Sequence, residues 1–408
     1  MRILIVTKIY PRPGHENLGS FNRQQFRSLA VDHDVTIISP VAWTEALAAR
    51  WSGRPTSVRY TNADGIDVWH PVYYYPPKIF PHLYGECYLA SLRPSFVRAV
   101  REHRPDVVMA CFAYPDGWAT VRLAHEMGLP VVVKCHGSDL LVAGRRGKRR
   151  ALVAEVMRDA EMIVTVGRNL ADHALRLGAN EENVRIVAHG IDRKLFHPVD
   201  RGDARARLAI PAEGAMILFV GNILLSKGAG VLVRACDRLT RSGVEFRCYL
   251  VGRGRDESRI RSLIATLGLE ERVTLVGPRP LAELTNWYGA CDLVALPSYS
   301  EGIPNVLREA SACGRPFVAT RVGGIPEIAD PATSVLVEPD SPEALADALA
   351  DVLSGRMTAA ALAEASGGAS AISWEESAER LVDTLLTAIR IRTPGFRTSD
   401  AKPSPSTR

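Results

Sequence analysis

The segment LVAL at residues 293–296 is followed, after three residues, by SEGIPNVLREASACG at residues 300–314. The apolar run has the length of a buried strand. Pro304 suits the first position of a helix, and Gly314 suits the residue just past its end. A strand that leads through a loop into a helix is the repeating unit of a parallel sheet covered by helices. This segment therefore predicts a doubly wound α/β domain.

The same unit recurs along the 408 residues, because short apolar runs alternate with helical patterns such as Phe21–Val31 and Val231–Arg241. Strands that are apolar on both faces indicate a parallel sheet buried on both sides. In the first half the predicted strands are Ile3–Val6, Val35–Ile38, Val107–Ala110, Val131–Val133, Ile163–Val166 and Val184–Val187. In the second half they are Met216–Val220, Phe246–Val251, Val273–Val276, Leu293–Leu296, Phe317–Ala319 and Val335–Val337.

Two successive arrays of this kind predict two Rossmann-like domains. We expect the first to span residues 1–198 and the second residues 199–373, because the sequence turns charged and loop-like near 198–214. Residues 374–392 form an amphipathic pattern, which predicts a helix that packs across the domains. Residues 393–408 are rich in Pro, Ser, Thr and Lys and are expected to be disordered.

The composition is that of a globular protein. Hydrophobic residues make up 47% and charged residues 23%, which excludes wholesale disorder. No apolar run reaches the roughly 20 residues of a membrane span. The apolar run at the N-terminus, Ile3–Val6, is too short for the core of a signal peptide, so we expect a cytoplasmic protein. The seven cysteines contain no C-x-x-C pair, and reduced thiols are expected.

Ligands of open parallel sheets bind at the carboxyl ends of the strands, so the loops after the strands are the candidate sites. In the segment above, Glu301 precedes the predicted helix and Glu309 lies inside it, on the order of 10 Å apart. That is too far for two carboxylates that share one sugar carbon. It suits the two hydroxylated ends of an elongated ligand, with a diphosphate at the free N–H groups of the helix start. The ligand-binding candidates here are Glu301, Gly302, Ile303, Pro304, Asn305, Val306 and Glu309.

Five other loops offer lysine, arginine, histidine or close backbone approach. Lys227 is expected to open a helix after the first strand of the second domain, and the sequence there lacks the spacing of a P-loop. The further candidates are Gly221, Asn222, Gly252 and Arg253 in the second half, with Gly323 in the loop at 322–327, and Gly19 and His136 in the first half.

These motifs together resemble family 4 of the retaining glycosyltransferases. The resemblance is carried by the two glutamates with the segment at 310–316, by the loop at 322–324, and by HGSD at 136–139 and HGID at 189–192. It covers nearly the whole chain in the correct order. YPRP at 10–13 and GSF at 19–21 are similar to the branch that builds bacterial exopolysaccharide and teichuronic acid.

The resemblance implies a GT-B fold, in which a nucleotide-diphospho-sugar binds mainly to the second domain and the acceptor to the first. It implies that Glu301 holds the donor sugar, that Glu309 holds the ribose, and that Lys227 neutralises the diphosphate. His136 would contact the transferring sugar, and Gly19 would leave room for the phosphates. It also implies a UDP- or GDP-linked donor, a glycan or lipid-linked acceptor and retention of configuration. Because no cluster in the sequence has the spacing of metal ligands, we expect catalysis without a metal or other cofactor.

The chain departs from the family at Asn222, where a basic residue is usual beside the lysine. One phosphate charge then needs a partner elsewhere, such as Arg253, Arg321 or a group of the first domain. DHD at 32–34 has the form of a metal-binding motif but precedes a strand, at the wrong end for a site, so we interpret it as a polar turn. The alternatives are a nucleotide-sugar epimerase of the same fold and a non-catalytic sugar-binding protein. A dinucleotide oxidoreductase is disfavoured, because no complete G-x-G-x-x-G follows a strand.

Two features point to a membrane-bound acceptor. The basic residues Arg145, Arg146, Lys148, Arg149 and Arg150 form one run, which fits either a solvated helix start or contact with anionic lipid headgroups. The aromatic segment at 73–80 fits either a packed loop or a binding surface for a lipid-linked acceptor. We expect the protein to lie peripherally on the inner face of the plasma membrane.

Overall fold

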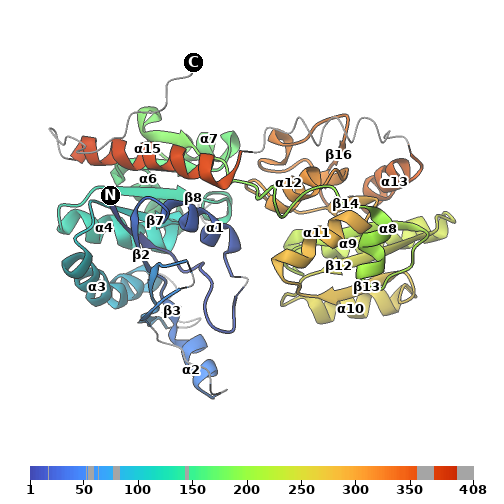
Figure 1. The fold of residues 1–408 in the computed structure, drawn as a ribbon, viewed down its shortest axis with the longest axis horizontal. Helices are drawn as coiled ribbons and strands as arrows, with labels where there is room; N and C mark the ends of the chain where they lie inside the picture. The colour runs from blue at the N-terminus through green and yellow to red at the C-terminus, as the bar shows by residue number, and fades with distance from the viewer. Residues whose placement is uncertain are drawn as a thin grey trace.

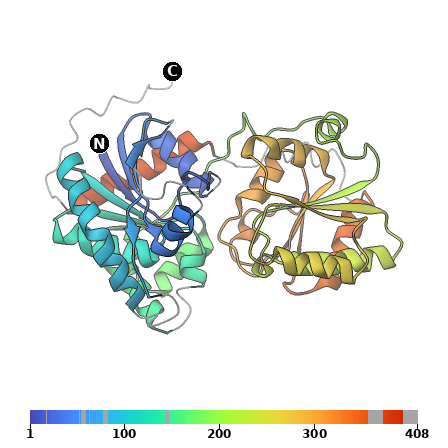
Figure 2. The same cartoon turned by 90° about the horizontal axis from the view of Figure 1, so that it is seen from below.

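A computed structural model describes residues 1–16, 18–51, 53, 59–62, 64–76, 83–142, 147–355 and 372–392. These residues form two α/β domains that lie side by side, each with a central sheet flanked by helices (Figures 1 and 2).

The first sheet has the order β10-β9-β8-β7-β1-β2-β5-β4, and its strands are parallel except for the antiparallel pair β4 and β5. The strands are β1 (Arg2–Val6), β2 (Asp34–Ile38), β4 (Arg59–Thr61), β5 (Asp67–Trp69), β7 (Val107–Cys111), β8 (Val131–Cys135), β9 (Met162–Thr165) and β10 (Val184–Ile186). The helices around it are α1 (Ser20–Leu29), α3 (Tyr84–His103), α4 (Trp118–Glu126), α5 (Ser138–Leu141), α6 (Gly147–Asp159) and α7 (Arg168–Arg176). Beside them, β3 (Val41–Ala42) pairs with β6 (Val72–Tyr73), next to α2 (Trp43–Trp51).

Alternation along β1 explains why this sheet is covered on both faces. Ile3 and Ile5 pack into one buried cluster with Phe26 of α1, whereas Leu4 and Val6 pack into another with α3 and α4. Because successive side chains of a strand point to opposite faces, one short apolar run supplies both cores.

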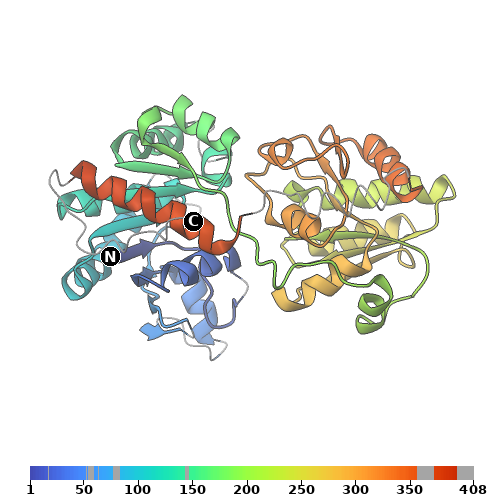
Figure 3. The same ribbon diagram turned by 45° about the horizontal axis from the view of Figure 1, so that its top comes forward.

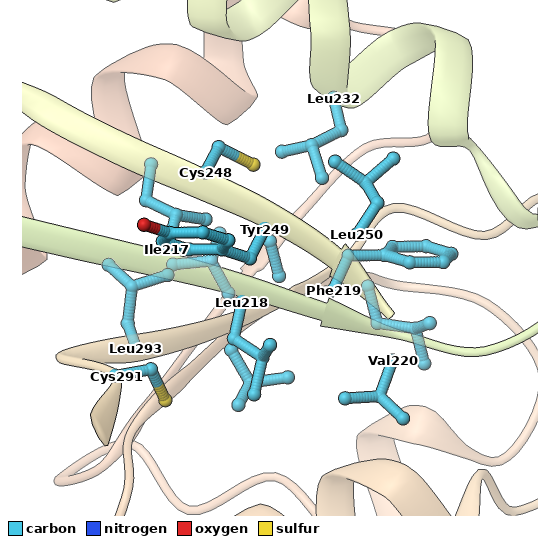
Figure 4. Packing of buried hydrophobic residues seen from close by; sticks show 14 of the residues in the cluster. Ile217, Leu218, Phe219, Val220, Leu232, Cys248, Tyr249, Leu250, Cys291 and Leu293 are labelled. Atoms are coloured by element: carbon cyan, nitrogen blue, oxygen red, sulfur yellow. The ribbon is translucent and has the colours of Figure 1, made fainter. Parts of the chain in front are cut away.

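The second sheet is parallel throughout, in the order β13-β12-β11-β14-β15-β16. The strands are β11 (Ala215–Val220), β12 (Phe246–Val251), β13 (Val273–Gly277), β14 (Leu293–Leu296), β15 (Phe317–Thr320) and β16 (Ser334–Val337). The helices are α8 (Arg201–Arg207), α9 (Ala229–Arg241), α10 (Glu257–Thr266), α11 (Leu281–Ala290), α12 (Asn305–Ala312) and α13 (Pro342–Leu353). Its core is one cluster in which Leu218 and Phe219 of β11 point to opposite sides (Figure 4).

The last described helix, α15 (Trp374–Arg392), lies along the first domain (Figure 3). Its main contacts are with α1, β7, β8 and β9, all elements of the first domain. We expected this helix to pack across the domains. Instead the chain crosses back and the helix covers one face of the first sheet, because its apolar stripe joins the cluster of Ile3 and Phe26.

Every strand predicted from the sequence is present, with ends within two residues of the prediction. The expected boundary at 198/199 falls between β10 and β11 and stays a prediction. The expected disorder of residues 393–408 lies outside the described residues.

Candidate functional site

The carboxyl ends of both sheets face each other, and the loops that follow the strands meet there. An ideal Cβ on Gly137, after β8, would lie 2.8 Å from the backbone nitrogen of Gly302, after β14. A Cβ on Gly302 would overlap the carbonyl oxygen of His136. Only glycine allows two backbones to approach so closely. The predicted loops of the two domains are therefore in direct contact.

Lys227 and Glu301 form the central ion pair of the second domain. The Lys227 ammonium lies 2.7 and 2.8 Å from the two carboxylate oxygens of Glu301. The Ser298 hydroxyl donates a further hydrogen bond of 2.7 Å to the same carboxylate. Lys227 ends a short 3₁₀ helix (Leu225–Lys227), and α9 begins at Ala229, so the lysine does not open the helix as we expected. The side chain of Glu301 is only 10% exposed, and the ion pair offsets the cost of burying this carboxylate.

Glu309 lies inside α12 and is buried. The Tyr288 hydroxyl donates a 2.7 Å hydrogen bond to its Oε2 atom. Burial raises the pKa of Glu309 to about 7, while the Tyr288 hydroxyl and the Arg308 charge act in the opposite direction. A carboxyl group that ionises near neutral pH in a buried position is typical of a ligand-binding site.

His136 follows β8 and packs among aromatic rings rather than against polar groups. Its ring centroid lies 4.7 Å from that of Phe112, 5.0 Å from Phe21 and 5.3 Å from His189. Both ring nitrogens are buried and form no hydrogen bond with the described residues. Burial, and then the Lys134 charge, lower the pKa of His136 well below its usual value, so the ring is neutral.

Asp139, which is not among the predicted site residues, fixes the His136 loop. Its carboxylate accepts hydrogen bonds from the backbone N–H groups of His136 (3.2 Å), Gly137 (2.8 Å) and Ala113 (3.0 Å). It thereby joins the loops after β7 and β8. The motif at 136–139 contained this residue, but its partner Ala113 lies in another loop that the sequence does not place.

The predicted residues around the start of α12 contribute to the domain contact. Ile303 packs against the apolar cluster of the first domain. The Asn305 side-chain oxygen lies 3.1 Å from Nδ1 of His189, which is in the connection between the domains. Gly302 and Pro304 are buried, and Val306 is half-buried and packs against the core of the second domain.

A second link between the domains was not predicted. Glu327, in the loop after β15, accepts hydrogen bonds of 2.6 and 2.7 Å from the backbone N–H groups of Arg168 and Asn169 at the start of α7. A Cβ on Gly167 would lie 2.8 Å from the same carboxylate. The glutamate of one domain therefore caps a helix of the other.

The remaining predicted glycines shape the loops. Gly19 caps α1 with φ +66°, and a Cβ there would overlap the Ile9 carbonyl. Gly221 has φ +151°, and Gly252 packs directly against its carbonyl oxygen. Asn222 is exposed.

Arg253 is exposed, in the loop after β12. It lies close enough to His15 to lower the pKa of that imidazole, after the larger effects of burial and Arg12. A cation of the second domain thus acts electrostatically on the loop of the first domain that contains His15.

Three further findings bear on the predictions. The described residues contain no group of three or more histidine, cysteine, aspartate or glutamate side chains placed to hold a metal ion. Within the described ranges, no helix is long and apolar enough to cross a membrane. In DHD at 32–34, Asp32 and His33 lie in the turn before β2 and Asp34 is its first residue, so the three residues lie at the amino end of the strand.

Two Rossmann-like domains with facing loops of this kind form a GT-B fold. The family model for glycosyltransferase family 4 matches residues 24–195, and that for group 1 glycosyl transferases matches residues 200–367. The chain belongs to glycosyltransferase family 4. It is an enzyme that transfers a sugar from a nucleotide-sugar donor.

Curated relatives support this assignment over most of the chain. A D-inositol 3-phosphate glycosyltransferase of Catenulispora acidiphila is 30% identical, with 95% of both chains covered. A putative teichuronic acid biosynthesis glycosyltransferase, TuaC of Bacillus subtilis, is 27% identical over 86% of this chain and 88% of the relative. Neither the epimerase nor the sugar-binding protein that we considered receives support from these comparisons.

Solved structures show the same fold at lower identity. Sucrose-phosphate synthase from Thermosynechococcus elongatus superposes with a TM-score of 0.77 at 22% identity, covering 94% of this chain and 98% of the other. Anabaena HepE, in a complex with UDP-glucose, superposes with a TM-score of 0.73 at 19% identity, covering 95% and 100%.

Proposed function

We propose that the loops after β11, β14 and β15 bind a UDP- or GDP-linked sugar, which is transferred with retention of configuration to an acceptor on the first domain. The observation that carries this proposal is the arrangement of Lys227 and Glu301 beside the domain contact, with Glu309 buried behind them. HepE was solved with UDP-glucose, which supports a donor of this chemistry.

The ion pair between Lys227 and Glu301 has a direct role in this scheme. When the donor binds, its diphosphate takes the Lys227 ammonium, and the Glu301 carboxylate turns to the hydroxyls of the donor sugar. Negative charge grows on the diphosphate as the sugar leaves in an oxocarbenium-like state. A positioned cation and helix-end N–H groups stabilise that charge. The leaving phosphate oxygen accepts the proton of the acceptor hydroxyl on the same face.

Glu309 is assigned to the ribose hydroxyls. Its Oε2 atom accepts from Tyr288, so Oε1 is the oxygen that would accept from the ligand. Arg253 is assigned to the second phosphate charge, in place of the basic residue that Asn222 replaces. His136 is assigned to the donor sugar, since a sugar hydroxyl would supply the hydrogen bond that its ring nitrogens lack.

The acceptor and the location in the cell remain proposals. The named relatives act on inositol 3-phosphate or in teichuronic acid synthesis, so we propose a polyol- or glycan-type acceptor for cell-surface glycan synthesis. Lys148, Arg149 and Arg150 are exposed in the first turn of α6, where contact with anionic lipid stays a prediction. Arg145 and Arg146 lie outside the described residues, as does the aromatic segment beyond Pro76.

The test is a calorimetric screen of UDP, GDP and ADP and their sugars, with and without EDTA. We expect one base to bind and EDTA to have no effect. Glu309→Ala should weaken binding by at least about tenfold, because it removes charge-assisted hydrogen bonds worth about 1.5–3 kcal/mol. Glu343→Ala, which changes an exposed glutamate of α13, should leave the affinity unchanged. Wild-type affinity in folded Glu309→Ala would disprove the ribose assignment, and no binding of any nucleotide would disprove the donor site.

A further inference from the structure

We propose that His189, in the connection between the domains, is a positioning residue of the transfer. It holds α12, which carries Glu309, at a fixed place relative to His136 on the other domain. This role rests on the proposed function, because it needs the ribose at Glu309 and the donor sugar at His136. His189 itself is not assigned to the ligand.

Helix α12 of the second domain contacts His189 through two hydrogen bonds. The Nδ1 atom of His189 lies 3.1 Å from the side-chain oxygen of Asn305. The buried guanidinium of Arg308 donates from Nη1 to the His189 carbonyl oxygen. Asn305 and Arg308 are three residues apart, so they share one face of the helix. Because Arg308 directly precedes Glu309, these bonds fix the part of α12 that carries the Glu309 carboxyl group.

The first domain packs against the ring of His189. Its centroid lies 5.2 Å from that of Phe21 in the first turn of α1, 5.3 Å from that of His136 after β8, and 5.8 Å from that of Trp374 at the start of α15. His189 is only 5% exposed. Close-packed rings in a protein interior transmit displacement to their neighbours. A shift of the His189 ring would therefore also displace His136.

The backbone on both sides of His189 is fixed to α15. The Ser377 hydroxyl donates a 2.6 Å hydrogen bond to the carbonyl oxygen of Ala188. A Cβ on Gly190 would lie 2.4 Å from the backbone of Trp374, so only glycine allows this approach. Because these contacts restrain the connection, the two bonds from α12 hold that helix against the first domain.

The His189 imidazole is neutral. Burial, and then the Lys134 charge, lower the pKa of His189 well below its usual value. The Asn305 oxygen accepts, so the ring proton is assigned to Nδ1. The Nε2 atom is buried and forms no hydrogen bond within the described part of the chain. The bond to Asn305 is therefore the polar contact that orients the ring.

This arrangement predicts a selective effect on the donor sugar. The nucleotide is assigned to the second domain alone, whereas the sugar is assigned to groups of both domains, Glu301 and His136. A misplacement of about 1 Å between binding groups can cost on the order of a hundredfold in rate. Loss of the His189 contacts should therefore weaken the hold on the sugar and spare the nucleotide.

The experiment is calorimetric titration of the full chain with UDP, GDP, UDP-glucose, UDP-galactose, UDP-N-acetylglucosamine and GDP-mannose. His189→Phe keeps a ring and removes the N–H group, whereas His189→Asn keeps an N–H group and removes the ring. In both variants we expect the nucleotide-sugar that the wild type binds to bind roughly tenfold more weakly, and its nucleoside diphosphate to keep its affinity within about twofold. His197→Phe and His197→Asn change an exposed histidine of the same connection and should match the wild type for both ligands.

The outcomes separate this role from the proposed function. No binding of any nucleotide-sugar by the wild type would disprove the proposed function. If the wild type binds one, unchanged affinities in both His189 variants would overturn the positioning role. An equal loss for the nucleotide-sugar and the nucleoside diphosphate would overturn it too, because a merely structural residue affects both. If melting curves show that the His189 variants do not fold, Phe21→Leu carries the same test, since it removes a ring packed on both His189 and His136.

Discussion

The Glu309 carboxyl group links the local structure of α12 to the pH dependence of the enzyme. Its pKa of about 7 arises mainly from burial, and the bond from Tyr288 holds it lower than burial alone would. In the folded chain the group binds a proton between its usual value of 4.5 and about 7 that the unfolded chain does not. This group therefore contributes stability that is present at low pH and is lost as pH rises toward 7.

Nucleotide binding should show the opposite dependence. Ribose hydroxyls donate to a carboxylate, so ionised Glu309 is the binding form. We expect the dissociation constant of the nucleoside diphosphate to rise as pH falls below about 7, approaching tenfold per unit. Tyr288→Phe removes a bond that favours the ionised form, so the transition should move to higher pH. Titrations between about pH 6 and 8 measure both effects.

The control for this pH dependence is Glu309→Gln, which has no titrating group at the position. Its affinity should be lower than that of the wild type and flat across the same range. If the slope below pH 7 persists in Glu309→Gln, another group controls nucleotide binding. The terminal phosphate of the nucleotide, whose second ionisation falls at about pH 6, would be the first candidate.

At the scale of helices and strands, the hydrogen bonds from α7 to Glu327 couple the two domains directly. A carboxylate at a helix N-terminus satisfies free N–H groups and interacts favourably with the helix dipole, by about 1 kcal/mol at an exposed site. Because Glu327 and α7 belong to different domains, that energy stabilises the closed arrangement rather than one domain.

We therefore expect Glu327→Ala to shift the balance toward separated domains by roughly fivefold, since about 1 kcal/mol corresponds to that ratio. Small-angle scattering should show a larger radius of gyration, and the melting temperature should change little. Glu343→Ala is again the matched surface variant and should scatter as the wild type does. A compact Glu327→Ala with an unchanged scattering curve would show that the packing of Ile303 and Gly302 closes the domains without this bond.

The elements themselves could be predicted from the sequence, because strands buried on both faces produce runs such as Leu293–Leu296. The short strands β4 and β5 were missed, since they are three residues long and mix polar with apolar side chains. The loop residues Glu301 and Lys227 could be proposed as site residues, because ligands of parallel sheets bind at the carboxyl ends of the strands. The ion pair between these two residues could not be predicted from the sequence, and neither could the hydrogen bonds of Glu327 and Asn305 to the first domain. Those contacts depend on how two separate sheets face each other, and no local pattern records that.

At the scale of the whole molecule, a series of buried hydrogen bonds connects the last helix to the first domain. The Lys134 ammonium on β8 binds the side-chain oxygen of Gln25 on α1. Gln25 in turn donates to the Ser377 hydroxyl of α15 at 3.1 Å, and Ser377 donates to the Ala188 carbonyl at 2.6 Å. These hydrogen bonds thus join β8, α1 and α15 to the start of the connection between the domains.

The two segments that connect the domains, near residues 190 and 373, lie side by side at this point. The Ile191 backbone N–H donates to the Ile372 carbonyl at 2.9 Å, and a Cβ on Gly190 would overlap the backbone of Trp374. The position of α15 therefore constrains the outgoing connection, and through it the approach of the second domain to the first.

The hydrogen bond between Lys134 and Gln25 allows a test of this series of hydrogen bonds, because Lys134 is a fully buried cation with Gln25 as its partner. Burial lowers the pKa of Lys134 to about 8. Gln25→Leu should lower the melting temperature by roughly 5 °C or more, since an unsatisfied buried charge costs about 3 kcal/mol or more. The loss should shrink as pH rises above about 8, where the folded chain releases the lysine proton before the unfolded chain does.

The double variant Gln25→Leu/Lys134→Met distinguishes a charge effect from a packing effect. It replaces both partners by apolar side chains of similar size, so it should recover most of the lost melting temperature and show no gain between about pH 8 and 10. A double variant as unstable as Gln25→Leu would mean that the bond from Gln25 to Ser377, rather than the lysine charge, holds α15 in place. Ser377→Ala should then lower the melting temperature by a similar amount. It removes the hydrogen bonds of α15 to Gln25 and Ala188 and leaves Lys134 bound to Gln25.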